Sequence, residues 1–218
     1  MVVLRKSFQQ GSVFVQVIYV IGGIGSGKSE LMKLFRDKDI PTLDLDVVGH
    51  KVLLDKVVKD QLVLYFGSDI LNIDKTINRK KLAQKAFSSA EATQVLNNAT
   101  TKAINAYEQQ WCNLQEKQGQ NYCAIEVSAY DGPNGRFPRK ADCTIVVIAS
   151  QSVREKRLVK RGMSLQDARA RISRQVNDEQ RIKWADVVLE NNEGIKSFSN
   201  AFSDWFCEYK KAQSDNKA

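Results

Sequence analysis

Eight residues near the N-terminus have the types and the spacing of a loop that binds phosphate groups. The segment from Gly22 to Ser29 reads Gly-Gly-Ile-Gly-Ser-Gly-Lys-Ser, which matches the pattern Gly-x4-Gly-Lys-Ser/Thr. Glycines let the backbone curl so that successive N–H groups point at phosphate oxygens. In such a loop Lys28 neutralises the terminal phosphates and the Ser29 hydroxyl binds Mg²⁺. The segment therefore predicts a site for a nucleoside triphosphate with its magnesium ion.

The residues on either side of this segment supply the elements that the pattern needs. Residues 13–21 are rich in β-branched side chains and are typical of a buried strand. Leu31, Leu34 and Phe35 then recur at helical spacing, so the N-terminus of a helix would add its partial positive charge. The alternative, a glycine-rich turn that contains a lysine by chance, would need neither a strand before it nor a helix after it. We expect the nucleotide-binding residues to be Gly23, Ile24, Gly25, Ser26, Gly27, Lys28, Ser29 and Glu30.

Two carboxylates follow the next predicted strand, residues 40–44. Asp44 and Asp46 flank Leu45, and side chains at the carboxyl ends of parallel strands meet at one edge of the sheet. One carboxylate would hold Mg²⁺ or its waters, and the other would take the proton from an attacking hydroxyl. The alternative, a pair of turn aspartates, remains open at this stage.

Three arginines further along the chain fall on one helix face. Arg154, Arg157 and Arg161 are spaced by three and four residues, and Gly162 follows them directly. Several guanidinium groups on one face suit a lid that closes over a triphosphate, neutralises its charge and excludes water. A solvated basic helix is the alternative interpretation.

The order of the elements predicts an α/β fold of the P-loop NTPase or kinase class, with a parallel β-sheet flanked by helices. We expect one P-loop kinase chain over residues 1–218, with its core at about 13–46, 120–150 and 177–213. A mostly helical region is expected at about 47–118, and residues 152–176 would form the lid. Residues 1–12 are expected to be an extension or a misassigned start.

Composition limits the classes of partner. Hydrophobic residues make up 43% of the 218 positions and charged residues 27%, so the chain is expected to bury a core. The net charge of +8 favours anionic partners. Aromatic side chains are not interleaved with the basic residues, so the sequence does not indicate nucleic acid as the partner. No apolar run is long enough to span a membrane. The four scattered cysteines indicate reduced thiols and a cytoplasmic location; we expect a monomer or a weak homo-oligomer.

With these residues identified, the chain resembles the dephospho-coenzyme A kinase family. The Gly22 to Ser29 segment is similar to the family's phosphate loop, and Asp44-Leu45-Asp46 to its Asp-Ala-Asp motif. Phe66-Gly67 and the run Asn78-Arg79-x2-Leu82 resemble its helical substrate-binding region. Further on, Arg157 and Arg161 match lid arginines, and a run from Arg174-Gln175 through Arg181 to Asn191 resembles the closing signature near the adenine site.

The resemblance implies an activity and a role for each matched residue. It implies transfer of the γ-phosphoryl group of ATP, with Mg²⁺, to the ribose 3′-hydroxyl of dephospho-coenzyme A. Asp46 would be the base, Lys28 and the lid arginines Arg157 and Arg161 would stabilise charge, and Asp44 and Arg79 would contact the acceptor. Arg181 and Asn191 would lie at the nucleotide. No nucleic-acid or membrane partner is implied.

The chain departs from the family pattern on the acceptor side. The family's His-Pro pair is missing from the stretch Leu96 to Lys102, and its Pro-Leu-Leu is replaced by Ser128-Ala129-Tyr130. His50 stands where an arginine is common. Two alternatives to the implied activity are therefore kept: a P-loop kinase of another small molecule, such as a nucleoside monophosphate or a sugar acid, and a nucleotide-binding module without catalysis.

Overall fold

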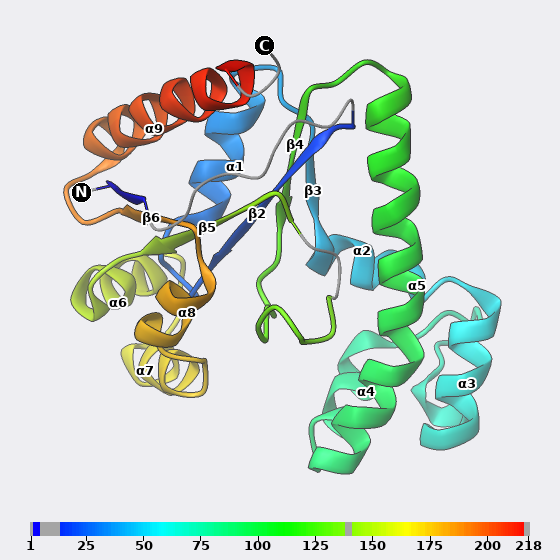
Figure 1. Cartoon of the computed structure of the whole chain (residues 1–218). Helices are drawn as coiled ribbons and strands as arrows, with labels where there is room; N and C mark the ends of the chain where they lie inside the picture. Colours follow the sequence, from blue (N-terminus) through cyan, green and yellow to red (C-terminus); the bar gives the residue numbers. More distant parts are fainter. Residues whose placement is uncertain (1, 5–13, 138–140, 216–218) are drawn as a thin grey trace. The chain divides into compact units, whose positions relative to one another are not determined.

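A β-sheet forms the centre of the structure, a computed structural model that describes residues 2–4, 14–137 and 141–215 (Figure 1). Its strand order is β1-β6-β5-β2-β4-β3. β2 pairs in parallel with β4 and β5, and β5 with β6. The strands are β1 Val2–Leu4, β2 Gln16–Gly22, β3 Thr42–Asp44, β4 Tyr122–Glu126, β5 Cys143–Ile148 and β6 Val187–Glu190. The predicted α/β fold with a parallel sheet is confirmed.

One edge of the sheet differs from the expectation. β1 pairs antiparallel with β6, with Val3 opposite Val188, so residues 2–4 are a strand and not only an extension. Residue 1 and residues 5–13 lie outside the described residues, and so does the rest of the expectation for the N-terminus. A three-residue strand carries no alternation long enough to detect by sequence pattern.

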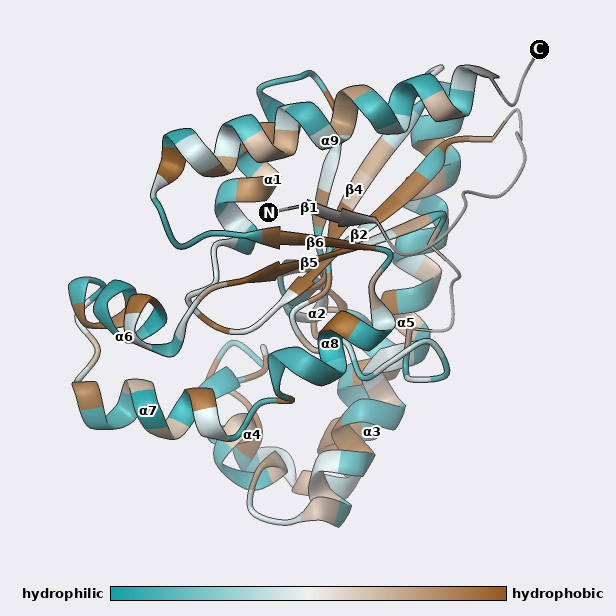
Figure 2. Ribbon diagram, turned by 60° about the vertical axis from the view of Figure 1, so that its left-hand side comes forward, coloured by the Kyte–Doolittle hydropathy of each residue, from teal (hydrophilic) through white to brown (hydrophobic). Residues whose placement is uncertain are grey.

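The central strands form because their side chains are buried on both faces. From Val17 to Ile21 every side chain of β2 is buried, as is every side chain of β5 from Cys143 to Val147. Continuous runs of β-branched residues are typical of parallel strands covered by helices. Figure 2 shows these strands in the hydrophobic colour, whereas α6 Gln151–Lys160 and α7 Leu165–Ser173 are largely hydrophilic.

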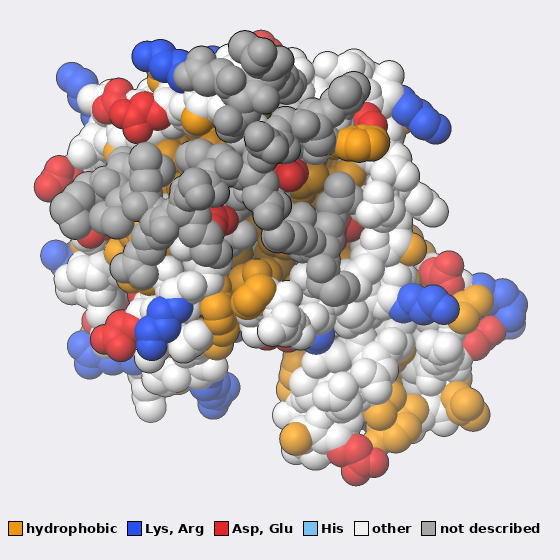
Figure 3. Space-filling view, viewed as in Figure 1, with side chains coloured by type: hydrophobic (Ala, Val, Ile, Leu, Met, Phe, Trp, Pro, Cys, Tyr) orange, Lys and Arg blue, Asp and Glu red, His pale blue; other side chains and the backbone are white. Residues whose placement is uncertain are grey.

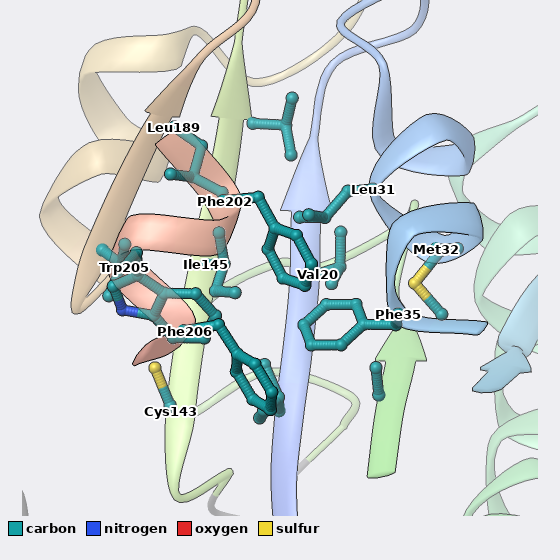
Figure 4. Close-up of a cluster of buried hydrophobic side chains, with 14 of the residues drawn as sticks. Val20, Leu31, Met32, Phe35, Cys143, Ile145, Leu189, Phe202, Trp205 and Phe206 are labelled. Atoms are coloured by element: carbon teal, nitrogen blue, oxygen red, sulfur yellow. The ribbon is translucent and has the colours of Figure 1, made fainter. Parts of the chain in front are cut away.

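Aromatic side chains of two helices fill the space beside the sheet. α1, Lys28–Arg36, and α9, Ile195–Asp215, contact each other. Phe35 of α1 meets Phe202 of α9 edge to face, with 4.8 Å between ring centroids (Figure 4). The apolar stripe of α9 is buried against the sheet; it comprises Phe198, Phe202, Trp205, Phe206 and Tyr209.

A helical hairpin follows β5. α6 and α7 contact each other and are separated by a turn at Gly162, which has a φ of 90°. Together the two helices span most of the segment 152–176, and α7 ends at Ser173. A further short helix, α8 Asp178–Trp184, begins after the Asn177 cap and leads into β6. Polar residues dominate α8, so its sequence carries no apolar stripe.

Residues Asp44–Trp111 form a second compact unit, separate from the unit made of Met1–Leu43 and Cys112–Ala218. It contains α2 Leu45–Val52, α3 Lys56–Phe66, the short 3-10 helix η1 Ser68–Ile70, α4 Arg79–Ala86 and most of α5 Ala90–Lys117. Leu62, Ile70 and Ala86 are fully buried in its core. α3 is followed by Gly67, its C-cap, whose φ is 88°.

In the described parts of the chain, no helix is both long enough and apolar enough to cross a membrane.

Candidate functional site

The glycine-rich segment forms a curled loop between β2 and α1. Gly27 is the N-cap of α1 with a φ of 116°, and Gly25 has a φ of 77°. Side chains with a β-carbon rarely adopt these angles. A β-carbon on Gly27 would also overlap the amide nitrogen of Asn191. Glycine is therefore required at position 27 both by the backbone angle and by space.

Lys28 is buried at the start of α1. Its Nζ donates to the Gly22 carbonyl oxygen at 3.1 Å and lies 3.7 Å from Oε1 of Glu126. Ser29, the next residue, is exposed. The ammonium group and the N-terminus of α1 thus place positive charge inside the loop, where the burial of Lys28 limits screening by water. This geometry suits an anion of high charge.

The outer side of the loop is bound by Arg157 and Asn191. Nη1 of Arg157 donates to the carbonyl oxygens of Gly25 at 3.2 Å and Ser26 at 3.0 Å. Its Nη2 donates to the backbone and side-chain oxygens of Asn191, both at 2.9 Å. Nδ2 of Asn191 donates to the Ser26 carbonyl oxygen at 3.0 Å. Arg157, predicted as a lid arginine, and Asn191, predicted at the nucleotide, therefore both contact the loop directly.

Arg161 and Arg181 differ in their exposure to solvent. Arg161 caps α6 and is exposed. Burial, and then the charge of Arg161, lower the pKa of the Arg157 guanidinium. The two cations repel each other, and a bound anion would reduce that repulsion. Arg181 is buried and donates to Oδ1 of Asp178 at 2.8 Å. Asp178 in turn lies 3.5 Å from Nη1 of Arg154, which contacts the loop.

In the second unit, Asp44 and Asp46 differ in their contacts. Asp44 caps α2, because its Oδ1 accepts from the backbone N–H of Asp46 at 2.8 Å and of Val47 at 3.3 Å. Asp46 lies in the first turn of α2 with an exposed side chain. One carboxylate of the predicted pair is therefore occupied by capping, a role that aspartates at this position commonly have, and the other faces solvent.

Arg79 begins α4, directly after the Asn78 cap. Lys80 and Lys81 follow it, and all three cations are exposed. No acidic residue lies in this first turn. Cations at a helix N-terminus are unfavourable, since they meet the partial positive charge of the helix. An anionic partner would offset that cost.

Comparison with known proteins decides the family. A family model described as dephospho-CoA kinase matches residues 16–197. The chain belongs to the dephospho-CoA kinase family. Curated relatives named dephospho-CoA kinase include one from Corynebacterium efficiens, 36% identical with 83% of this chain and 90% of that protein covered. Another, from Corynebacterium glutamicum, is 38% identical, with 80% and 88% covered.

Solved structures agree on the fold. A protein from Thermus thermophilus matches with a TM-score of 0.74 and 25% identity, covering 89% of this chain and 98% of that one. The dephospho-CoA kinase from Campylobacter jejuni has a TM-score of 0.60 at 23% identity, with 88% and 96% covered. Membership of a kinase family makes the chain a phosphotransferase that uses ATP.

The segment that departs from the dephospho-CoA kinase pattern after β4 is held by contacts of its own. Asp131 accepts from the backbone N–H of Arg136 at 3.0 Å and from its Nε at 2.9 Å. Tyr130 lies edge to face with Tyr19 and with Trp184, with 6.1 and 5.8 Å between centroids. The segment is thus ordered without the family's Pro-Leu-Leu.

Sequence reasoning missed Glu126, which the structure brings to Lys28. It is the last residue of β4, and its side chain is 10% exposed. A signal was available: Glu126 is the one carboxylate in the otherwise apolar run of residues 122–127, near the end where ligands bind in parallel sheets. Arg154 and Gln175, noted only as parts of longer motifs, also contact the loop.

Proposed function

We propose that this chain transfers the γ-phosphoryl group of ATP to the ribose 3′-hydroxyl of dephospho-CoA. The observation that carries the proposal is the buried Lys28 ammonium at the N-terminus of α1, inside a loop of the sequence that the family uses for ATP. Phosphoryl transfer needs little covalent chemistry from the protein, so positioning and charge supply most of the rate acceleration.

On the nucleotide side, the loop residues from Gly23 to Glu30 would bind the phosphates. Lys28 would bridge the β- and γ-phosphates, and Asn191 and Arg181 would complete the nucleotide site. The exposed Ser29 hydroxyl fits a magnesium ion, which commonly has few protein oxygens and several phosphate or water oxygens around it. When bound, Mg²⁺ would supply positive charge that offsets the charge of the phosphates.

We further propose that residues 152–176 act as a lid and that Arg157 and Arg161 stabilise charge on the transferring group. Arg157 already contacts the loop, and its repulsion from Arg161 would fall when an anion binds. The two guanidinium groups would then offset part of the negative charge of the terminal phosphates.

On the acceptor side, we propose that Asp46 takes the proton of the attacking hydroxyl. Its exposed carboxylate is available, whereas Asp44 caps α2 and would orient the turn that carries Asp46 as well as contact the substrate. Residues 47–118 would bind dephospho-CoA, whose pyrophosphate suits the cations Arg79, Lys80 and Lys81 at the start of α4.

The deciding experiment mixes the purified chain with ATP, Mg²⁺ and dephospho-CoA and identifies the product by mass. We expect a product heavier by one phosphoryl group. Asp46→Asn should retain ATP binding while turnover falls by about 10²–10⁴-fold, because a positioned base contributes that much. Asp60→Asn, which removes an exposed carboxylate of the same unit, is the control. Near-normal turnover in Asp46→Asn would refute its role as base.

The same assay separates the two alternatives. ADP release with a nucleoside monophosphate or a sugar acid, and not with dephospho-CoA, would indicate another small-molecule kinase. ATP binding without ADP release for any acceptor would indicate a module without catalysis. We also propose that the protein acts in the cytoplasm as a monomer or weak homo-oligomer, without nucleic-acid or membrane partners. The buried thiols of Cys112, Cys123 and Cys143 suit a reducing compartment.

A further inference from the structure

Two side chains from the segment after β5 hold one residue of the phosphate loop. Arg154 of α6 donates from Nε to the Ile24 carbonyl oxygen at 2.8 Å. Gln175, between α7 and α8, accepts from the Ile24 N–H through Oε1, also at 2.8 Å. Both backbone groups of Ile24 are therefore bound by residues at least 130 positions away in the sequence.

The Arg154 guanidinium is fixed in this position. The residue is 6% exposed. Its Nη2 lies 3.4 Å from Oε1 of Gln175, and its Nη1 lies 3.5 Å from Oδ2 of Asp178. A guanidinium removed from water is retained only where its donors find partners. Here those partners are the loop itself and two residues next to α8.

Gly23 makes room for this guanidinium. Its φ is not among the positive values of the described glycines, so its backbone angle does not call for glycine. A β-carbon at this position would overlap Nη2 of Arg154 and crowd Cζ at 2.6 Å. The glycine therefore serves the close approach of Arg154, which is a separate observation from the hydrogen bonds.

The hydrogen bonds of α6 orient the N–H groups of the loop. In a planar trans peptide the C=O and the following N–H point in opposite directions. Arg154 binds the carbonyl of Ile24, so the N–H of Gly25 points away from α6. Arg157 binds the carbonyl of Ser26, which turns the N–H of Gly27 the same way. A cation at the carbonyl end also polarises the peptide and strengthens its N–H as a donor.

We infer that Arg154 is a positioning residue for the triphosphate and that Gln175 is its partner. Together they fix the orientation of the two peptide planes on either side of Ile24 before the nucleotide binds. The loop then changes conformation little when it binds phosphate, which lowers the free-energy cost of binding. The inference rests on the proposed function only in so far as the loop binds the phosphates of ATP; it makes no use of the acceptor.

The test measures the binding of ATP and of inorganic triphosphate to the full chain by calorimetry. We expect Arg154→Ala to weaken both by at least about tenfold, as for the loss of a charged hydrogen bond. Gln175→Ala should weaken both by about threefold or more. Because the two side chains share the Ile24 residue, the double variant should bind little worse than Arg154→Ala alone. Inorganic triphosphate isolates the loop from contacts to the base.

The matched control is Lys196→Gln. Lys196 is an exposed cation of α9, outside the hairpin and the loop, so its loss changes the net charge equally without touching the loop. It should bind both probes like the original chain. In turnover assays, Arg154→Ala should raise the KM for ATP, with the KM for dephospho-CoA and the kcat at saturating ATP within about threefold of the original. A general loss of fold would move all three.

The outcomes are distinct. Arg154→Ala or, should that variant not fold, Gln175→Ala binding triphosphate as the original chain does would overturn the inference. Weakened ATP binding with unchanged triphosphate binding would also overturn it, because the residue would then act on the base. An original chain that binds triphosphate but leaves dephospho-CoA unmodified would refute the proposed acceptor and leave the inference standing.

Discussion

Lys28 and Glu126 form a buried ion pair beneath the phosphate loop, with 3.7 Å between Nζ and Oε1. β2 and β4 are neighbours in parallel register, with Val20 opposite Glu126, so the carboxylate stands at the strand end nearest the loop. The side chains are 9% and 10% exposed. A charge this buried depends on its partner, which gives Lys28 a role in stability as well as in binding.

The two roles of Lys28 are separable by mutation. Lys28→Met should lower the free energy of unfolding by about 3 kcal/mol, because it leaves the Glu126 charge uncompensated. Adding Glu126→Gln should recover most of that loss, yet turnover should stay at least about 10²-fold below the original. Denaturant unfolding and ADP release measure the two quantities. Lys33→Met, on the exposed face of α1, is the control; equal stability of Lys28→Met and the original chain would contradict the prediction.

Gly23→Ala should reproduce the effect of Arg154→Ala. The added methyl group overlaps the guanidinium, so the side chain must leave its contacts with Ile24 and Gln175. We expect ATP binding to weaken by about tenfold. In the Arg154→Ala background the same substitution should cost much less, because the overlapping group is gone. Additive losses in the calorimetric cycle would mean that Gly23 serves the loop in another way.

Phe202→Ala should destabilise the first unit strongly. The ring is fully buried between α1 and the sheet, beside Phe35 and Phe206. Loss of such a side chain removes its transfer free energy and leaves a cavity, which costs about 3–5 kcal/mol. Ile195→Ala, at the start of the same helix and 60% exposed, should change the unfolding free energy by less than about 0.5 kcal/mol. Comparable losses in both variants would argue against the packing of α9 described above.

The α6–α7 hairpin should loosen at acid pH. Hydrogen bonds to Glu155, from Arg169 first and then from Gln151, lower the pKa of its carboxyl below the usual 4.5. Its stabilising effect is therefore fully present above that value and is lost as the pH falls through the lowered folded pKa. Glu155→Gln should melt below the original chain at pH 7, and the gap should close toward pH 3.

Thermal unfolding across this pH range checks the prediction. Glu208→Gln removes an exposed carboxylate from α9 and controls for the change in net charge. A gap between Glu155→Gln and the original chain that stays constant from pH 7 to pH 3 would contradict the assigned role of the carboxylate.

Local signals were sufficient for much of the fold. β2, the loop and α1 follow one another within about 20 residues. Each is predicted by a local pattern: β-branched residues for β2, glycine spacing for the loop and helical periodicity for α1. The end of α3 at Gly67 also has a local signal, because glycine adopts a positive φ without strain. By contrast, β1 and α8 are short and lack an apolar period, so their pairing and packing partners define them.

The predicted site residues also divide into those whose contacts are local and those whose contacts depend on packing between distant segments. Asp44 and Asp46 were read as a functional pair, and the structure adds that Asp44 caps α2, a local fact that the position of an aspartate before a helix already suggests. For Arg154, the sequence indicated only a position on the same helix face as Arg157. Its contact with Ile24 spans 130 residues and depends on how α6 packs beside the loop.

By itself, the sequence determined the phosphate loop, the class of fold and the family, because these depend on residue types at short, regular spacing. Tertiary structure alone decided which groups complete the loop: Glu126 below Lys28, and Arg154, Arg157, Gln175 and Asn191 along its outer side. The physical reason is that hydrogen bonds and ion pairs depend on distances of a few ångströms, and between distant parts of a chain only the packing of the sheet and its helices sets such distances.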